Sequence, residues 1–219
     1  MKKSEQKIIN GIKGYLEKNF KNESTGHDYY HFLRVHKIAR KIAEKEGGDL
    51  FVIELGALLH DIADWKFHGG TNEVGIKKAR NLLKSFVVEE KNIDRVCYII
   101  DNISFKGAGL KNKMKTIEGK IVQDADRLDA IGAIGIARVF TYGGSVGREI
   151  YNPDIKAKIH GSFKEYKSNK SSSINHFYEK LLLLKNMLNT KTAKKMAEGR
   201  HKFLQLFLKE FFAEWKGAK

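Results

Sequence analysis

A single proline, Pro153, in a chain of 219 residues is the feature that most limits what this sequence can fold into. Proline is the strongest local interruption of a helix, so one proline leaves nearly the whole chain free to be helical. Apolar residues also recur at three- and four-residue intervals in almost every segment, which is the spacing of one helix face. The sequence therefore predicts an all-α protein.

One predicted helix follows Asp28 and carries the first polar residue of interest. Val35, Ile42 and the apolar residues between them form a single stripe, which ends at Gly47. His31 lies one turn before Val35 and therefore belongs to the same inward face.

A second predicted helix, LFVIELGALLHDIA, is apolar nearly all round and should run through the centre of the core. Asp49 stands where a capping side chain is expected. His60 and Asp61 come at the C-terminal end of this segment. Further helices are predicted at about 72–85, 89–103, 118–140, 174–188 and 192–215, with residues 141–172 irregular.

The length suits one domain. No apolar run approaches the ~20 residues of a membrane-spanning helix, and the N-terminus reads as an amphipathic helix and not as a secretory signal. A lone cysteine, Cys97, excludes an internal disulfide framework. We expect a cytoplasmic protein with no membrane partner.

The net charge is +15, from 41 basic and 26 acidic residues. A field of this sign concentrates phosphorylated molecules around the chain, although a lysine-rich surface that keeps the protein in solution explains it equally well. Only eight of the basic residues are arginine, the side chain best suited to bidentate recognition of phosphates and bases. Nucleic acid is therefore an unlikely partner, and a small phosphorylated substrate is expected.

The pair His60 and Asp61 calls for a cation. An ionised carboxylate at the end of the most apolar helix is strongly disfavoured without a positive neighbour. A divalent metal satisfies this need, because imidazole and carboxylate groups are both good ligands. His31 offers a third ligand, and an acidic residue on the helix after Gly119 offers a fourth.

Three ordered motifs, HDYYHFLRV, ALLHDIADWKF and QDADRLDAIGA, resemble those of the HD-domain phosphohydrolases, a superfamily named for its histidine–aspartate doublet. WKF, ISFKG, INHFYEKLLLLKNMLNT and GRHKF extend the resemblance to stand-alone bacterial members of about this length. It implies one HD-type helical bundle over 1–219, with a metal site in its core. The metal-binding core would span about 24–140 and a helical extension about 141–219.

The resemblance also implies the ligands: His31, His60, Asp61 and Asp126 of the Ala125–Asp126–Arg127 triplet. Alternatives remain. Each histidine alone could be a hydrogen-bonded core residue, and the helix dipole could explain acids at Asp124 and Asp126. One divalent ion is expected, with Mn²⁺ favoured and Mg²⁺, Co²⁺, Ni²⁺, Fe²⁺ or Zn²⁺ as other candidates.

Asp64 is the candidate general base, because it stands three residues after Asp61 and shares its face if the helix continues. The alternative is an exposed helix-end acid paired with Lys66 or Lys37.

Hydrolysis of a phosphate ester or anhydride also needs positive charge and hydrogen bonds on the non-bridging oxygens. Beside the three motifs stand five candidate substrate-binding residues: Arg34, Lys66, Asn102, Lys106 and Arg127. Arg34 could instead pair with an acidic neighbour, and Asn102 could simply end its helix.

Members of this subgroup act on nucleotides. The resemblance thus implies cleavage of a nucleoside triphosphate to a monophosphate and pyrophosphate, with dephosphorylation of a nucleoside monophosphate as the alternative. A different class of function is a non-catalytic, metal-stabilised module that binds RNA or another acidic partner through the basic segment 106–120. A homodimer is compatible with either reading.

Overall fold

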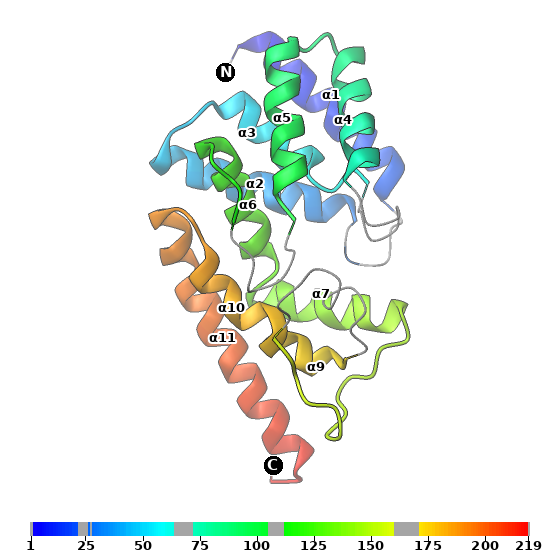
Figure 1. The fold of residues 1–219 in the computed structure, drawn as a ribbon, viewed down its shortest axis with the longest axis vertical. Coiled ribbons are helices and arrows are strands. Elements are labelled where there is room, and N and C mark those ends of the chain that lie inside the picture. Colours follow the sequence, from blue (N-terminus) through cyan, green and yellow to red (C-terminus); the bar gives the residue numbers. More distant parts are fainter. Residues whose placement is uncertain are drawn as a thin grey trace. The chain divides into compact units, whose positions relative to one another are not determined.

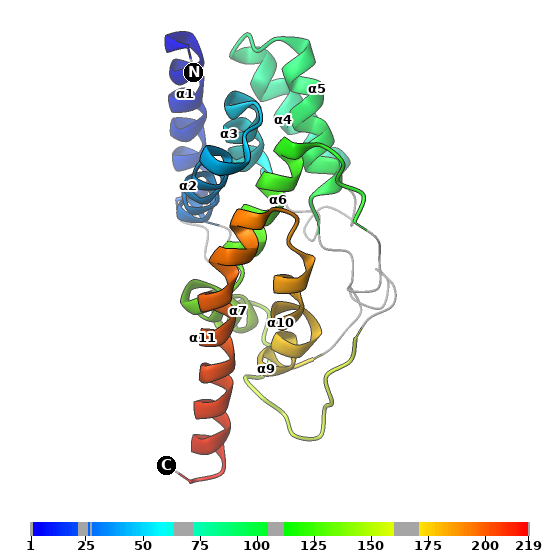
Figure 2. The same ribbon diagram turned by 90° about the vertical axis from the view of Figure 1, so that its left-hand side faces the viewer.

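The computed structural model of the protein describes residues 2–21, 26, 28–63, 72–104, 112–159 and 171–218 (Figures 1 and 2). These residues form helices and connecting segments, with no β-strand among them. The predicted all-α class is confirmed.

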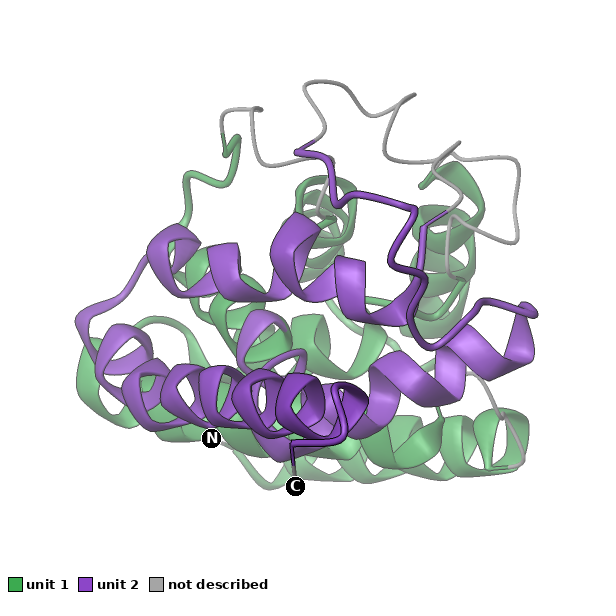
Figure 3. Ribbon diagram, turned by 90° about the horizontal axis from the view of Figure 1, so that it is seen from below, with its two compact units in different colours: residues 1–104, 112–126 green, residues 105–111, 127–219 purple. Residues whose placement is uncertain are grey.

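The chain divides into two compact units, coloured separately in Figure 3. Unit 1 comprises residues 1–104 and 112–126, and unit 2 comprises residues 105–111 and 127–219. This division differs from the predicted metal-binding core and C-terminal extension, which stay a prediction.

Unit 1 is built around helix α3, Leu50–Leu59, in which only buried residues occur after Leu50. The side chain of Asp49 accepts hydrogen bonds from the backbone N–H groups of Phe51 and Val52, at 3.1 and 3.3 Å, so the predicted cap is confirmed. Around α3 pack α1, α2 and α5, with bounds Lys3–Phe20, Tyr29–Glu46 and Glu90–Asn102. Helix α4, Glu73–Ser85, packs on α5.

Gly56 brings three helices of unit 1 together. A Cβ atom at this position would lie 3.1 Å from Ile99 of α5 and 3.3 Å from Val122 of α6, Ile117–Asp129. The missing side chain therefore lets both helices approach the centre of α3 closely.

Arg95, within α5, contacts acidic residues at the starts of α3 and α6. Its guanidinium lies 2.6 Å from Asp49 and 2.9 Å from Glu118, and Glu118 also accepts the backbone N–H of Asp49 at 3.1 Å. These contacts fix the start of α3 against the start of α6.

Unit 2 is held by aromatic packing. Helix α7, Gly132–Ser145, packs against α11, Lys191–Trp215. Phe177 stacks on Phe207 with ring centroids 5.5 Å apart, and Phe140 contacts both rings. Between these helices the chain forms short α9, Ser173–His176, a π-helical turn, Phe177–Leu181, short α10, Leu182–Leu184, and a 3₁₀ turn, Lys185–Met187.

The continuous helix expected at 118–140 is wrong, because α6 ends at Asp129 and α7 begins at Gly132. Ile131 is extended, and Gly132 has φ +78°, a conformation that favours glycine. The apolar pattern runs through this break and so concealed it.

The helix expected from residue 50 to 63 is shorter than predicted. It ends at Leu59, and residues 60–63 form a turn. The other predicted helices are confirmed to within about two residues, although the segment at 174–188 departs from regular α geometry. Nowhere in the described ranges is a helix both long and apolar enough to cross a lipid bilayer.

Candidate metal centre

His31 is placed by the first turn of α2. The carboxylate of Asp28 caps this helix by accepting the His31 backbone N–H at 2.8 Å. The His31 side chain is fully buried, as its position on the apolar stripe predicts. The helix start therefore fixes the residue from which the imidazole extends.

His60 follows the last residue of α3, and its ring is anchored at one edge. Its Nδ1 atom lies 2.8 Å from the carbonyl oxygen of Ala57. A carbonyl only accepts, so Nδ1 carries the proton, and in the neutral ring Nε2 keeps a free lone pair. The tautomer assigned in this way is the one a metal-binding imidazole requires.

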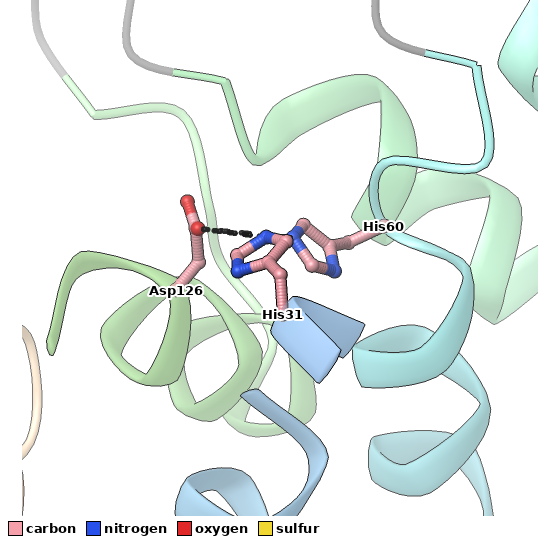
Figure 4. A group of neighbouring side chains, drawn as sticks. All are labelled: His31, His60 and Asp126. Atoms are coloured by element: carbon pink, nitrogen blue, oxygen red, sulfur yellow. Dashed lines mark hydrogen bonds and ion pairs between the residues drawn. The ribbon is translucent and has the colours of Figure 1, made fainter. Parts of the chain in front are cut away.

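The two imidazoles face each other (Figure 4). Their Nε2 atoms lie 3.1 Å apart. The carboxylate of Asp126 lies 3.8 Å from His31 Nε2 and 3.7 Å from His60 Nε2, and that of Asp61 lies 3.9 and 3.7 Å from the same atoms. Ligating atoms of His31, His60 and Asp126 all fall within 4.8 Å of one another.

These separations fit a shared ion. Ligands that bind a divalent metal at about 2.1 Å lie roughly 3 Å apart when adjacent in an octahedron and roughly 4 Å apart when opposite. The measured separations between ring nitrogens and carboxylate oxygens fall within that span. The donor set, two imidazoles and two carboxylates, suits Mn²⁺, Fe²⁺, Zn²⁺ and related ions.

The electrostatics of the centre also favour a cation. Burial by itself lowers the pKa of His60, but the carboxylates of Asp61 and Asp126 outweigh it and raise the pKa to about 9. The centre thus stabilises positive charge beside a ring from which water is excluded.

Burial differs sharply between the two kinds of ligand. The side chains of His31 and His60 are 0% and 1% exposed, whereas those of Asp61 and Asp126 are 22% and 33% exposed. The cluster is therefore closed on its histidine side and open to solvent on its carboxylate side. A site with an open side can admit a substrate.

The geometry distinguishes Asp126 from Asp124. Both lie on α6, but the group of closely spaced ligating atoms consists of His31, His60 and Asp126 and does not include Asp124. Asp61 is also outside that group, and its place at the centre rests on its distances of 3.9 and 3.7 Å to the two imidazoles. Asp124 is fully buried. This arrangement favours Asp126 as the fourth ligand, as the resemblance implied.

The predicted catalytic and substrate-binding residues are only partly within the described chain. Asp64, Lys66 and Lys106 lie outside the described residues. The premise that the helix continues to Asp64 is wrong, because α3 ends at Leu59. The role of Asp64 as general base stays a prediction that rests on its position in the motif.

The other three candidates are described. Arg34 is half-buried on α2, one turn after His31. Asn102 is the last residue of α5, as the alternative to substrate binding expected, and its amide nitrogen lies 2.9 Å from the carbonyl oxygen of Tyr98. Arg127 is buried and donates to the carbonyl of Met187, which favours a structural role. Substrate contact by these three residues stays a prediction.

Sequence reasoning missed a buried ionic group in unit 1, on the same helix that precedes His60. Glu54, in the middle of α3, is 1% exposed, with His36 Nε2 at 3.4 Å and Arg40 Nε at 3.0 Å. Burial raises the pKa of Glu54, but His36 and Arg40 outweigh this and lower it. The signal was present, since one acidic residue interrupts an otherwise apolar helix.

Comparison with known proteins places the chain in a family. The HD domain matches residues 28–131, which include all four proposed ligands. The Bacillus subtilis protein YpgQ is 40% identical over 207 residues, covering 94% of this chain and 93% of YpgQ. This chain therefore belongs to the HD-domain superfamily.

Solved structures of similar proteins support the same family assignment. A HD-superfamily hydrolase from Bacillus thuringiensis has a TM-score of 0.72 at 43% identity, covering 97% of this chain and 98% of that one. A protein from Lactobacillus plantarum reaches a TM-score of 0.87 at 35% identity, with the same coverage. YpgQ crystallised in complex with ADP has a TM-score of 0.72 at 36% identity, covering 94% of this chain and 97% of YpgQ. The fold is that of an HD-superfamily hydrolase.

Proposed function

We propose that this protein is a divalent-metal-dependent phosphohydrolase that cleaves a nucleoside triphosphate to a monophosphate and pyrophosphate. The observation that carries the proposal is the pair of facing imidazoles, 3.1 Å apart at Nε2, beside two partly exposed carboxylates. The complex of YpgQ with ADP supports a nucleotide as ligand.

In this proposal His31, His60, Asp61 and Asp126 hold the ion. An ion bound there supplies Lewis acidity and lowers the pKa of a coordinated water toward about 7. Mn²⁺ remains the favoured ion. The hydrogen bond to Ala57 keeps the Nε2 lone pair of His60 directed at the centre, and the first turn of α2 does the positioning for His31.

Residues of this chain supply the remaining functions. We assign to Asp64 the removal of a proton from the attacking water. The assignment rests on its position in the motif, three residues after Asp61. Lys66, Lys106 and Arg34 neutralise charge on the phosphate oxygens, and Asn102 donates a hydrogen bond to the substrate. The net charge of +15 favours the approach of polyphosphates. We place the protein in the cytoplasm, where nucleotides are its substrates.

A panel of nucleoside tri-, di- and monophosphates tests the proposal, with Mn²⁺, Mg²⁺, Co²⁺, Ni²⁺ or no added metal and with phosphate and pyrophosphate measured separately. We expect pyrophosphate without phosphate, only with metal, and not from the Asp61→Ala variant. Phosphate released from monophosphates would select the alternative reaction. Equal turnover by the parent and the variant would contradict an enzymatic role for the centre.

A further inference from the structure

Gln123 is a buried amide for which neither the metal centre nor the core packing accounts. It lies on α6, one turn before Asp126, and is 1% exposed. A buried amide that made no hydrogen bonds would destabilise the fold, so its partners indicate what it does.

The amide nitrogen of Gln123 contacts the end of α5. It lies 3.4 Å from the carbonyl oxygen of Asn102 and 3.3 Å from that of Ile103. Carbonyl groups at a helix C-terminus have no partner within the helix. Gln123 therefore fixes this end of α5 against α6.

The amide oxygen of Gln123 contacts the chain where it returns. Asn112 donates to it from Nδ2 at 2.8 Å. The orientation of Asn112 is set in turn, because its Oδ1 accepts the backbone N–H of Met114 at 3.1 Å. The side chain of Gln123 thus binds both the C-terminal end of α5 and Asn112, where the described chain resumes before α6.

The returning segment has further anchors in unit 1. The hydroxyl of Tyr98 donates to the carbonyl of Lys113 at 3.3 Å and accepts the backbone N–H of Lys115 at 3.1 Å. Met114 is buried, and a side chain at Gly119 would collide with it. The exposed lysines 113 and 115 therefore extend from a fixed backbone.

We propose that Gln123 is a positioning residue for nucleotide binding. It fixes the positions of Asn102 and of the lysine-containing segment 112–116 relative to the proposed metal ligand Asp126. The proposal rests on the proposed function. Gln123 and Asp126 are three residues apart on one helix and are neighbours on its surface. Hence the amide that fixes the segment and the carboxylate that lies against the two imidazoles extend from the same helix.

The test compares Gln123→Met with Asn112→Ala. The first variant removes the buried amide at similar size. The second removes, at an exposed residue, the hydrogen bonds of the Asn112 side chain to Gln123 and Met114. Val96→Ala is the control, because it destabilises the buried face of α5 without touching these hydrogen bonds. For Gln123→Met we expect KM for the triphosphate and the Kd of ADP with Mn²⁺ to rise about fivefold to tenfold, with kcat within about twofold. Asn112→Ala should show a smaller rise, and the double variant should add little to Gln123→Met.

Several results would overturn the proposal. Parental KM and ADP affinity in both variants would make Gln123 a purely structural tie, as would an equal rise in KM for Val96→Ala. A loss confined to kcat would mean that Gln123 acts on the metal centre. If the parent itself neither binds ADP nor cleaves nucleotides, the proposed function fails and this role with it, whereas an active parent with unaffected variants removes only the role of Gln123.

Discussion

The two units use buried polar groups in opposite ways. In unit 1, His31 of α2 and His60 of the turn after α3 direct their Nε2 atoms at one point beside carboxylates. In unit 2, buried polar side chains bind single backbone groups: Ser172 and Thr190 cap helices, Asn175 donates to the carbonyl of Ile155 at 2.6 Å, and Arg127 donates to that of Met187. Convergence of several ligating atoms on one point marks a binding centre, whereas pairing with single backbone groups stabilises the fold.

The largest expected effect follows from removing one converging imidazole. His60→Ala should lower the rate of metal-dependent hydrolysis by at least about 100-fold, because it removes a proposed metal ligand together with the hydrogen bond to Ala57 that orients it. Steady-state rates at saturating Mn²⁺ measure this. The matched control is His201→Ala in unit 2, which removes a histidine outside the centre and should keep activity within about twofold. Equal losses of activity in the two variants would contradict the claim that the histidines of unit 1 form the binding centre and that His201 of unit 2 does not belong to it.

Next comes a change in the aromatic packing of unit 2. Phe177 is fully buried against Phe207, so Phe177→Leu should lower the free energy of unfolding by about 1.5 kcal/mol. Urea denaturation measures the loss. The affinity for Mn²⁺ should stay at the parental value, because all four proposed ligands belong to unit 1. Loss of metal binding at a concentration where the variant is folded would show that the centre depends on unit 2.

A smaller effect is expected from acid. Burial lowers the pKa of His36. Burial raises the pKa of Glu54, but the contacts of Glu54 with His36 and Arg40 outweigh this, and the pKa of Glu54 is lowered. In both cases the unfolded chain binds protons more readily, so stability falls as the pH falls below about 6.5, where His36 titrates when unfolded, and falls further below about 4.5 through Glu54. Lys13 also faces Glu54 and helps to lower its pKa, while burial lowers the pKa of Lys13 itself.

Urea denaturation at a series of pH values checks this expectation. The double variant His36→Gln, Glu54→Gln should show a shallower dependence on pH than the parent. An unchanged slope would mean that other groups cause the acid sensitivity.

The smallest expected effect concerns the turn between α4 and α5. Val87 has φ +56° and is 87% exposed, so a branched side chain occupies a left-handed conformation without packing in return. Val87→Gly should raise the free energy of unfolding by about 1 kcal/mol. Val74→Gly, in an ordinary turn of α4, should lower it by about 0.5 kcal/mol. Metal affinity should not change in either variant, and a destabilised Val87→Gly would contradict the strain.

The sequence predicted those parts of the fold that depend on local pattern. Apolar spacing placed most helices, and Asp49 marked a helix start, because caps and helix faces are set within a few residues. The break at Ile131–Gly132 was missed, since the apolar pattern continues across it and only the backbone conformation of glycine shows the end. The end of α3 at Leu59 was missed because the apolar residues Ile62 and Ala63 continue the pattern beyond it.

The candidate site was predictable to the extent that motifs name residues. The motifs selected His31, His60, Asp61 and Asp126, and the structure brings their side chains together. Contacts that form only in the folded chain could not be predicted from the sequence. No motif or sequence spacing indicates the ion pair of Glu54 with Arg40 or the hydrogen bonds of Gln123.

The central claim is that the four residues bind one divalent ion, and calorimetric titration of Mn²⁺ into metal-stripped protein tests it most directly. The account predicts a single tight site per chain, retained in His201→Ala and lost in His60→Ala and Asp126→Asn while both variants remain helical by circular dichroism. Tight binding that survives in His60→Ala and Asp126→Asn would contradict it.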